Sequence, residues 1–91
     1  MKVEMAKSLC GHDKDELYVI YKKDDTFVFL INGTNKTIDH QKKKKQKHVQ
    51  VIKNLPKEIL NLLSEETEMS DELAKKMTKI YLRSIQCQKQ M

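Results

Sequence analysis

The first 53 residues consist of short apolar segments separated by polar turns. Residues 3–9 alternate loosely between apolar and polar side chains, and Gly11 follows, where a loop can adopt the positive φ that other residues resist. Residues 16–23 (ELYVIYKK) and 26–31 (TFVFLI) are rich in β-branched and aromatic residues, and the polar pair between them suits a tight reversal. The pattern predicts a strand, a loop and a β-hairpin.

Two more short strands are predicted beyond the hairpin. Asn32-Gly33 is a strong turn signal, and residues 34–38 are predicted to return from it as a strand. Residues 48–52 (HVQVI) give a further segment with strand character. About five short strands within 53 residues, joined mostly by tight turns, are typical of a small closed barrel rather than of a βα unit.

Helical periodicity replaces the strand pattern after residue 53. Pro56 suits the first turn of a helix whose apolar residues lie between 59 and 63. Ser70 is a good N-cap for a second helix, and the acids after it favour the positive end of that helix. An apolar stripe then recurs at three- and four-residue spacing: Leu73, Met77, Ile80, Tyr81 and Ile85. We therefore expect a barrel at residues 1–53 and a two-helix C-terminal extension at residues 54–91.

The apolar stripe of the second helix has two interpretations. Most such stripes belong to a core, and this one would then pack against the first helix or the side of the barrel. Alternatively, it binds a partner or a second copy, because helices added to a closed barrel need something to cover their apolar faces. The sequence leaves both interpretations open.

Positive charge is concentrated in the predicted barrel. The 91 residues contain 18 Lys and Arg against 13 Asp and Glu, and all the excess lies in residues 1–53, which hold 12 basic and 7 acidic side chains. Residues 36–53 alone contain seven lysines and one acid, including the run Lys42–Lys45. Adjacent ammonium groups repel one another unless an anion lies nearby, so the run predicts a polyanionic partner. The other interpretation is a hydrated, mobile loop that aids solubility.

Size and composition limit the class of protein. The length allows one domain with a modest core. Cys10 and Cys87 make one possible pair, no apolar stretch approaches a membrane span, and no signal-peptide core follows Met1, so we expect a reduced, cytoplasmic protein without membrane association. Two Phe and three Tyr, without Trp, leave few rings for stacking on bases, which favours contact with a nucleic-acid backbone.

No residue pattern predicts catalysis or a bound metal. The sequence has no nucleophile with an arranged base, no glycine-rich phosphate loop and no paired acids at an interpretable spacing. Cys10 and His12 lack the second close-spaced pair that a zinc site needs. We therefore expect neither enzymatic activity nor a cofactor.

Four short motifs occur in order within the first 52 residues: Gly11-His12-Asp13-Lys14, Tyr18-Val19-Ile20, Asn32-Gly33, and Lys47-His48-Val49 after the lysine run. This series resembles the KOW family of SH3-like β-barrels, and most closely the small bacterial KOW-domain RNA-binding proteins that are similar to a fourteen-e-type large-subunit ribosomal protein. The family usually has glycine after the loop lysine, whereas this chain has Asp15. An acid there weakens a close backbone approach to phosphate. The C-terminal helices lie outside the resemblance.

The resemblance and the charge together predict an RNA-binding site, with ribosomal RNA as the expected partner. The fold implied is a small SH3-like (KOW) five-stranded barrel followed by the two-helix extension, and the lysines would occupy a barrel loop. Expected phosphate contacts are Lys42, Lys43, Lys44, Lys45 and Lys47, with Lys14 assisting from the neighbouring loop and His48 orienting the segment. The alternative is a protein-interaction module that docks on an acidic partner through the lysine segment and the C-terminal helices. Binding of DNA is a third possibility.

Overall fold

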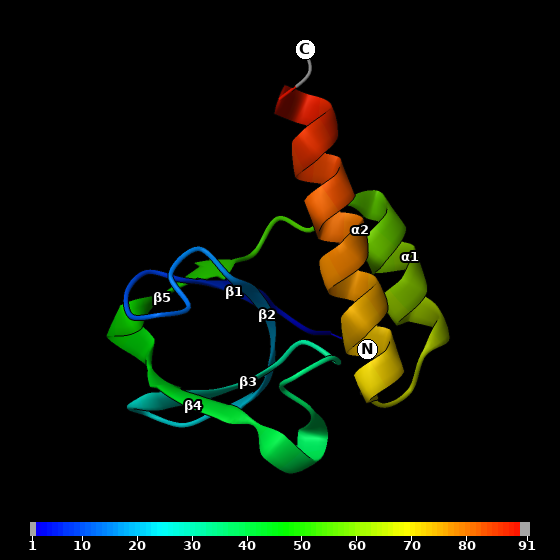
Figure 1. Cartoon of the computed structure of the whole chain (residues 1–91). Coiled ribbons are helices and arrows are strands. Elements are labelled where there is room, and N and C mark those ends of the chain that lie inside the picture. Colours follow the sequence, from blue (N-terminus) through cyan, green and yellow to red (C-terminus); the bar gives the residue numbers. More distant parts are fainter. Residues whose placement is uncertain (1, 90–91) are drawn as a thin grey trace.

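A computed structural model describes residues 2–89, and the side chains of residues 2–85. It contains a five-stranded antiparallel sheet followed by two helices, as Figure 1 shows. This confirms the coarser prediction of a small β structure with two C-terminal helices. The elements are β1 (Met5–Ser8), β2 (Leu17–Lys23), β3 (Phe27–Ile31), β4 (Lys42–Lys45), β5 (Val49–Ile52), α1 (Lys57–Glu65) and α2 (Asp71–Lys89), with short 3₁₀ helices η1 (Ile38–His40) and η2 (Gln46–His48).

The strand order is β4-β3-β2-β1-β5, so the two edge strands are consecutive in the chain and are joined by η2 alone. Figure 1 shows that the sheet is strongly curved, which allows one 3₁₀ turn to connect its two edges. No backbone ladder joins β4 to β5 within the described residues, and the sheet is open there. Closure into a barrel stays a prediction.

The predicted hairpin is confirmed as β2 and β3. Asp24 organises the turn between them, since its carboxylate accepts hydrogen bonds from the backbone N–H groups of Thr26 (2.9 Å) and Phe27 (2.7 Å). These bonds lower the pKa of the Asp24 carboxyl. A register irregularity lies between Ile20 and Lys22 on β2, beside Tyr21, and marks a bulge in the hairpin.

The strand predicted at residues 34–38 is wrong. The Asn32 side chain accepts hydrogen bonds from the backbone N–H groups of Thr34 and Lys36, which fold the segment into a local loop. The backbone N–H of Ile38 then donates to the carboxylate of Asp71, 2.7 Å away at the start of α2. The segment is therefore bound to a helix instead of to a strand.

The loop predicted for the lysine run is also wrong, because Lys42–Lys45 form β4 and pair with β3. A strand of four lysines is stable here because alternate side chains point to opposite faces of the sheet, which separates neighbouring charges. The sheet still has five strands, with the lysine run supplying the one that residues 34–38 do not.

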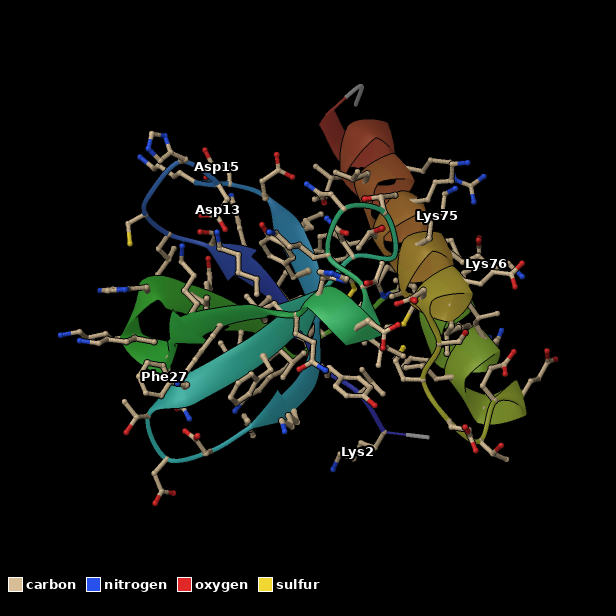
Figure 2. All side chains as sticks on the ribbon, turned by 60° about the horizontal axis from the view of Figure 1, so that its bottom comes forward. Lys2, Asp13, Asp15, Phe27, Lys75 and Lys76 are labelled. Atoms are coloured by element: carbon tan, nitrogen blue, oxygen red, sulfur yellow. The ribbon has the colours of Figure 1, made fainter. Side chains whose placement is uncertain are left out.

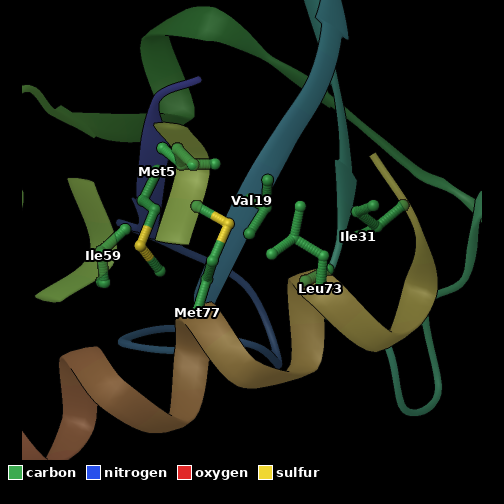
Figure 3. Close-up of a cluster of buried hydrophobic side chains, with 8 residues drawn as sticks. Met5, Val19, Ile31, Ile59, Leu73 and Met77 are labelled. Atoms are coloured by element: carbon green, nitrogen blue, oxygen red, sulfur yellow. The ribbon is translucent and has the colours of Figure 1, made fainter. Parts of the chain in front are cut away.

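Apolar residues fill both faces of the sheet. On the inner, concave face the buried residues are Ala6, Tyr18, Ile20, Val28, Leu30 and Val49. The outer face packs against the helices, and this cluster consists of Met5, Val19, Ile31, Ile59, Leu63, Leu73, Ala74 and Met77. Figure 3 shows Met5, Val19 and Ile31 of the strands facing Ile59, Leu73 and Met77 of the helices. Leu73 and Met77 of the predicted stripe are therefore confirmed as core, Ile80 and Tyr81 pack against it while partly buried, and Ile85 is not in the cluster. The helices share this core with the sheet.

Both helices begin close to their predicted positions. Pro56 is the N-cap of α1 and not its first helical residue, and only Ile59 and Leu63 of that helix are buried, with Leu60 exposed. The hydroxyl of Ser70 accepts a hydrogen bond from the backbone N–H of Leu73 (3.1 Å), which confirms the predicted cap of α2. Within residues 2–89, no helix is long and apolar enough to cross a membrane.

Gly33 fixes the contact between the Asn32–Lys36 loop and α2. Its φ of +79° lies in the left-handed region, and a Cβ atom there would overlap the backbone of Asp71 and lie 2.6 Å from the nitrogen of Lys75. Glycine is therefore required both for the turn and for the close approach of the loop to the first turn of α2.

Candidate nucleic-acid interface

The two faces of β4 are chemically different. Lys42 and Lys44 lie opposite Leu30 and Val28 of β3 and therefore face the inside of the curved sheet. Only 31 % of the Lys42 side chain and 11 % of the Lys44 side chain are exposed. Lys43 and Lys45 alternate with them, and both residues are exposed on the outer face. The run of identical residues is thus divided between the interior and the surface.

Asp13 is the counter-ion for the positive charges of the two inner lysines, Lys42 and Lys44. It lies on the loop between β1 and β2, which Figure 2 shows above the sheet. Its carboxylate accepts a hydrogen bond from the Lys44 ammonium at 2.8 Å and lies 3.4 Å from the Lys42 ammonium. The hydroxyls of Ser8 and Tyr18 donate to the same carboxylate at 3.0 and 2.9 Å. With 13 % of its side chain exposed, Asp13 is the centre of a partly buried ion cluster.

The ionisation of this cluster is fixed at neutral pH. Burial alone would raise the pKa of the Asp13 carboxyl, but hydrogen bonds from Lys44, Tyr18, Ser8 and Lys42 outweigh burial and hold that pKa well below its usual range. Burial and the hydrogen bond to Asp13 raise the pKa of the Tyr18 hydroxyl. Asp13 is therefore charged and Tyr18 neutral, so Lys44 has a permanent counter-ion within the fold.

Three lysines of residues 42–48 form no ion pair with a carboxylate of residues 2–85, although Lys43 attracts the Asp24 carboxylate electrostatically and so helps to lower its pKa. Lys43, Lys45 and Lys47 are exposed, and none of them forms an ion pair with a described carboxylate. Lys43 and Lys45 extend from a strand, and Lys47 extends from the 3₁₀ turn that follows it. The backbone that carries these charges is therefore ordered by strand pairing and is not a mobile loop.

The loop that carries Lys14 is attached to this segment through Asp13 and at two further points. The Lys44 ammonium donates to the carbonyl of Cys10 (2.9 Å), and the backbone N–H of Leu9 donates to the carbonyl of His48 (2.9 Å). Lys14 itself is exposed. The structure thus brings the predicted loop together with the lysine segment. His48, which is half-buried, ends η2 and takes part through its backbone carbonyl.

Asp15 occupies a backbone position that favours glycine. Its φ is +73°, in the left-handed region, where aspartate is among the few tolerated alternatives to glycine. The backbone N–H of Asp15 donates to the carbonyl of Ser8 (2.9 Å), and its carboxylate lies 3.6 Å from the ammonium of Lys7 in an exposed pair. Asp15 therefore adopts a backbone conformation that glycine favours, and its N–H joins the loop to the end of β1.

Sequence reasoning missed two aromatic residues and one lysine on the outer face. Phe27 and Phe29 of β3 are half-buried beside β4, and each has an ammonium group over its ring. The Lys43 nitrogen lies 4.2 Å from the centre of the Phe27 ring, and the Lys22 nitrogen lies 5.0 Å from the centre of the Phe29 ring. The alternation of the TFVFLI segment is the signal that could have placed both rings on one face.

No protein-family model and no curated protein gives a significant match to the chain. Within the described part of the chain, no group of three or more His, Cys, Asp or Glu side chains could hold a metal ion. Cys10 is an exposed free thiol, and the side chain of Cys87 lies outside the described side chains. The charged and aromatic surface around β4 is the candidate interface among the described residues.

Proposed function

We propose that the protein binds RNA, with ribosomal RNA as the first candidate, through phosphate contacts made by the surface around β4, and that it performs no catalysis. The observation that carries this proposal is a set of exposed lysines that form no ion pair with a described carboxylate, on an edge strand and its 3₁₀ turn: Lys43, Lys45 and Lys47. Neutralising each phosphate releases counterions, which makes such a surface favourable for a polyanion.

The spacing of the lysines supports contacts with a charged backbone. Lys43 and Lys45 are two residues apart on one face of a strand, so their Cα atoms are separated by roughly 6.5 to 7 Å. Holding two ammonium groups this close without a carboxylate costs free energy in the free protein, and a phosphate chain would remove that cost. Lys14 adds a fourth charge from the attached loop, and Lys42 contributes through the exposed part of its side chain.

The proposal gives Lys44 and His48 supporting roles. Lys44 orders β4 by pairing with Asp13 and with the Cys10 carbonyl, and its low exposure leaves little of it for RNA. His48 orients the segment where it rejoins the sheet, through the bond from Leu9 to its carbonyl. Lys43, Lys45, Lys47 and Lys14 are therefore the phosphate contacts that we expect to matter most.

We also propose that the sheet closes as an SH3-like barrel of the KOW type. Two features support this. The edge strands β4 and β5 are consecutive and are joined by a single 3₁₀ turn, as closure between them requires. The position at which the KOW family usually has glycine is Asp15, whose positive φ is the conformation that glycine favours.

Salt-dependent binding tests the proposed function. Fluorescence anisotropy with a ribosomal RNA fragment should give an affinity that falls steeply with salt, and four phosphate contacts imply a log-log slope of about −3 to −4. Reversing three charges in Lys43→Glu/Lys45→Glu/Lys47→Glu should remove most of the binding. A flat salt response would contradict the proposal.

A matched control is available on α2, where three lysines are also exposed: Lys75, Lys76 and Lys79. Figure 2 shows Lys75 and Lys76 on the side of the molecule away from Asp13 and Phe27. Reversal of these three charges changes the net charge equally and should leave most of the affinity in place. An equal loss in both triple variants would indicate attraction by net charge alone and would overturn the assignment of the surface.

Docking on a protein partner through the lysine segment and the helices stays the alternative. The outer face of the sheet covers the buried residues of the helices, whereas Leu60 of α1 and Leu82 of α2 are exposed. Competition with duplex DNA and with an acidic polypeptide in the same assay separates RNA binding from both alternatives.

A further inference from the structure

The outer face of the sheet is divided into a covered and an uncovered part. Met5, Val19 and Ile31 lie beneath the helices, whereas Phe27 and Phe29 belong to neither buried cluster. Figure 1 shows both helices beside β2, away from the outer end of the β3–β4 pair, and Figure 2 shows Phe27 on the far side of the molecule from α2. Two half-buried rings therefore lie on an open sheet surface.

Lysines surround these rings. Lys43 and Lys45 lie directly opposite Phe29 and Phe27 on β4, and Lys22 lies opposite Phe29 on β2. All three lysines are exposed, and none forms an ion pair with a carboxylate of residues 2–85, although Lys22 and Lys43 attract the Asp24 carboxylate electrostatically. We call this surface, made of Phe27, Phe29, Lys22, Lys43 and Lys45, the aromatic face.

We propose that the aromatic face binds unpaired RNA by stacking one base on each of the two phenylalanine rings while the lysines contact the flanking phosphates. This inference rests on the proposed RNA-binding function and specifies the form of RNA that is bound. Lys43 and Lys45 belong both to the aromatic face and to the phosphate-binding surface, so one strand of RNA can follow β4 and reach both.

The chemistry of the face favours single-stranded nucleic acid over other polyanions. Every base has a π-face that stacks on an aromatic ring, and successive bases need rings separated along their path. Phe27 and Phe29 are two residues apart on β3, so their Cα atoms are separated by roughly 6.5 to 7 Å. In a duplex the base faces are hidden in the stack, and an acidic polypeptide has charge without regular π-faces.

The lysines over the rings do not prevent stacking. A lysine ammonium is carried by a flexible four-carbon stem and can move from the ring to a phosphate without any change in the backbone. At exposed sites a cation–π contact is weaker than the stacking of a base on the same ring. Exchange of the ammonium for a base is therefore favourable, and the displaced charge finds a phosphate nearby.

Three probes of equal length test the inference: a 12-nucleotide oligouridylate, the same strand with abasic sugars, and a 12-base-pair RNA duplex. The wild-type protein should prefer the oligouridylate. Phe27→Leu and Phe29→Leu keep an apolar side chain but remove the π-face, and each should lower the affinity for oligouridylate by roughly 5- to 100-fold. Affinity for the abasic strand and for the duplex should not change, and neither should the salt slope.

A fluorescent reporter checks stacking independently of affinity. The chain contains no tryptophan, so Phe27→Trp introduces a single indole at the aromatic face. Stacking predicts retained or stronger binding and quenching of the indole fluorescence by oligouridylate, with no quenching by the abasic strand. Thermal unfolding of each variant shows whether the fold is preserved.

The possible outcomes separate this inference from the proposed function. If both leucine variants bind oligouridylate like the wild type, or lose affinity for the abasic strand equally, stacking is overturned while RNA binding stands. If the wild type binds none of the three probes, the proposed function itself fails. If an acidic polypeptide binds as tightly as oligouridylate and loses affinity in Phe27→Leu, the aromatic face is a protein-docking surface instead.

Discussion

On β4, Lys42 and Lys44 face the interior of the curved sheet, whereas their neighbours Lys43 and Lys45 face solvent. The inner pair has a fixed counter-ion in Asp13. The outer pair forms no ion pair with a described carboxylate; Lys43 lies over the π-face of Phe27 and attracts Asp24 electrostatically. Identical residues thus have different environments, because alternate side chains of a strand lie on opposite faces of the sheet. The inner lysines stabilise the fold, and the outer lysines are left in need of an anion.

The comparison also shows how a basic edge strand is kept in place. An edge strand has unpaired backbone groups and is a risk for aggregation, which charged side chains reduce. Lys42 and Lys44 hold β4 to the β1–β2 loop through Asp13, which a lysine strand without such a partner would not achieve. The strand is therefore both fixed on the inside and highly charged on the outside.

The largest expected effect is the loss of the inner counter-ion. Asp13→Asn leaves the Lys44 ammonium nearly buried without a carboxylate, which should lower the free energy of unfolding by about 3 kcal/mol. Asp15→Asn, on the same loop, removes only an exposed pair with Lys7 and should cost less than about 1 kcal/mol. Chemical denaturation measures both, and equal costs would remove the distinction between the inner and outer charges.

The second prediction compares two neighbouring lysines, of which one should affect mainly the stability of the fold and the other mainly the affinity for RNA. Lys44→Met leaves Asp13 with Lys42 as its only cation and should destabilise the protein by about 2 kcal/mol, with little effect on RNA binding once folding is ensured. Lys43→Met should change stability by less than about 1 kcal/mol, because it removes an exposed cation–π contact, yet it should weaken RNA binding several-fold. A larger loss of RNA affinity in Lys44→Met than in Lys43→Met would contradict the division into structural inner lysines and RNA-contacting outer lysines.

The third prediction concerns acid. Because the folded pKa of Asp13 is lower than its unfolded value near 3.9, its contribution to stability is fully present above that value and is lost as the pH falls toward the folded pKa. Thermal midpoints should therefore decrease below about pH 4, and Asp13→Asn should reduce this decrease. If the thermal midpoints of the wild type and of Asp13→Asn decrease equally below about pH 4, the role assigned to Asp13 is contradicted.

At alkaline pH, Tyr18 should give stability the opposite pH dependence, so that stability decreases as the pH rises. Its folded pKa is raised, so its contribution to stability is fully present below the unfolded value of about 10 and is lost as the pH rises above it. Tyr18→Phe should weaken that dependence, which spectrophotometric titration and unfolding experiments can follow together. A Tyr18 hydroxyl that titrates near its usual value would show that its bond to Asp13 is weak.

The smallest expected effect is that of salt on stability. Ions screen exposed charges strongly and buried pairs much less, so raising the salt concentration to 1 M should leave the Asp13 cluster in place. The difference in unfolding free energy between wild type and Asp13→Asn should therefore persist in 1 M salt, while RNA binding disappears. A difference that vanishes in salt would mean that the cluster behaves as a surface pair.

Much of the fold could be predicted because it depends on local patterns. The hairpin of β2 and β3 follows from two β-rich segments with an aspartate turn, and α2 follows from an apolar stripe with a serine cap. The strand predicted at residues 34–38 failed for one local and one distant reason. The Asn32 side chain competes for the backbone N–H groups of Thr34 and Lys36, which is a local effect. Asp71, which binds the N–H of Ile38, lies 33 positions away, and no local pattern contains that contact.

The candidate site divides in the same way. The location of the excess charge and its proximity to the Gly11–Lys14 loop were predicted, but the sequence treated all the lysines of the run as equivalent, and the bonds that attach the loop to it come from the structure. Only the register with β3 and the position of Asp13, 31 residues from Lys44, decide which lysines point inward. The count of aromatic residues argued against stacking, yet the sheet gathers Phe27 and Phe29 on one open face.

The sequence by itself therefore determined four of the five strands, the two helices, the position of the positive charge and the turn residues, because periodicity, capping and composition act over a few neighbouring residues. The tertiary structure alone decided that the lysine run is an edge strand, that Asp13 neutralises its inner half, and that its outer half lies beside two aromatic rings. These outcomes depend on pairing register and on burial, which join residues far apart in the chain and become definite only when the sheet has curved.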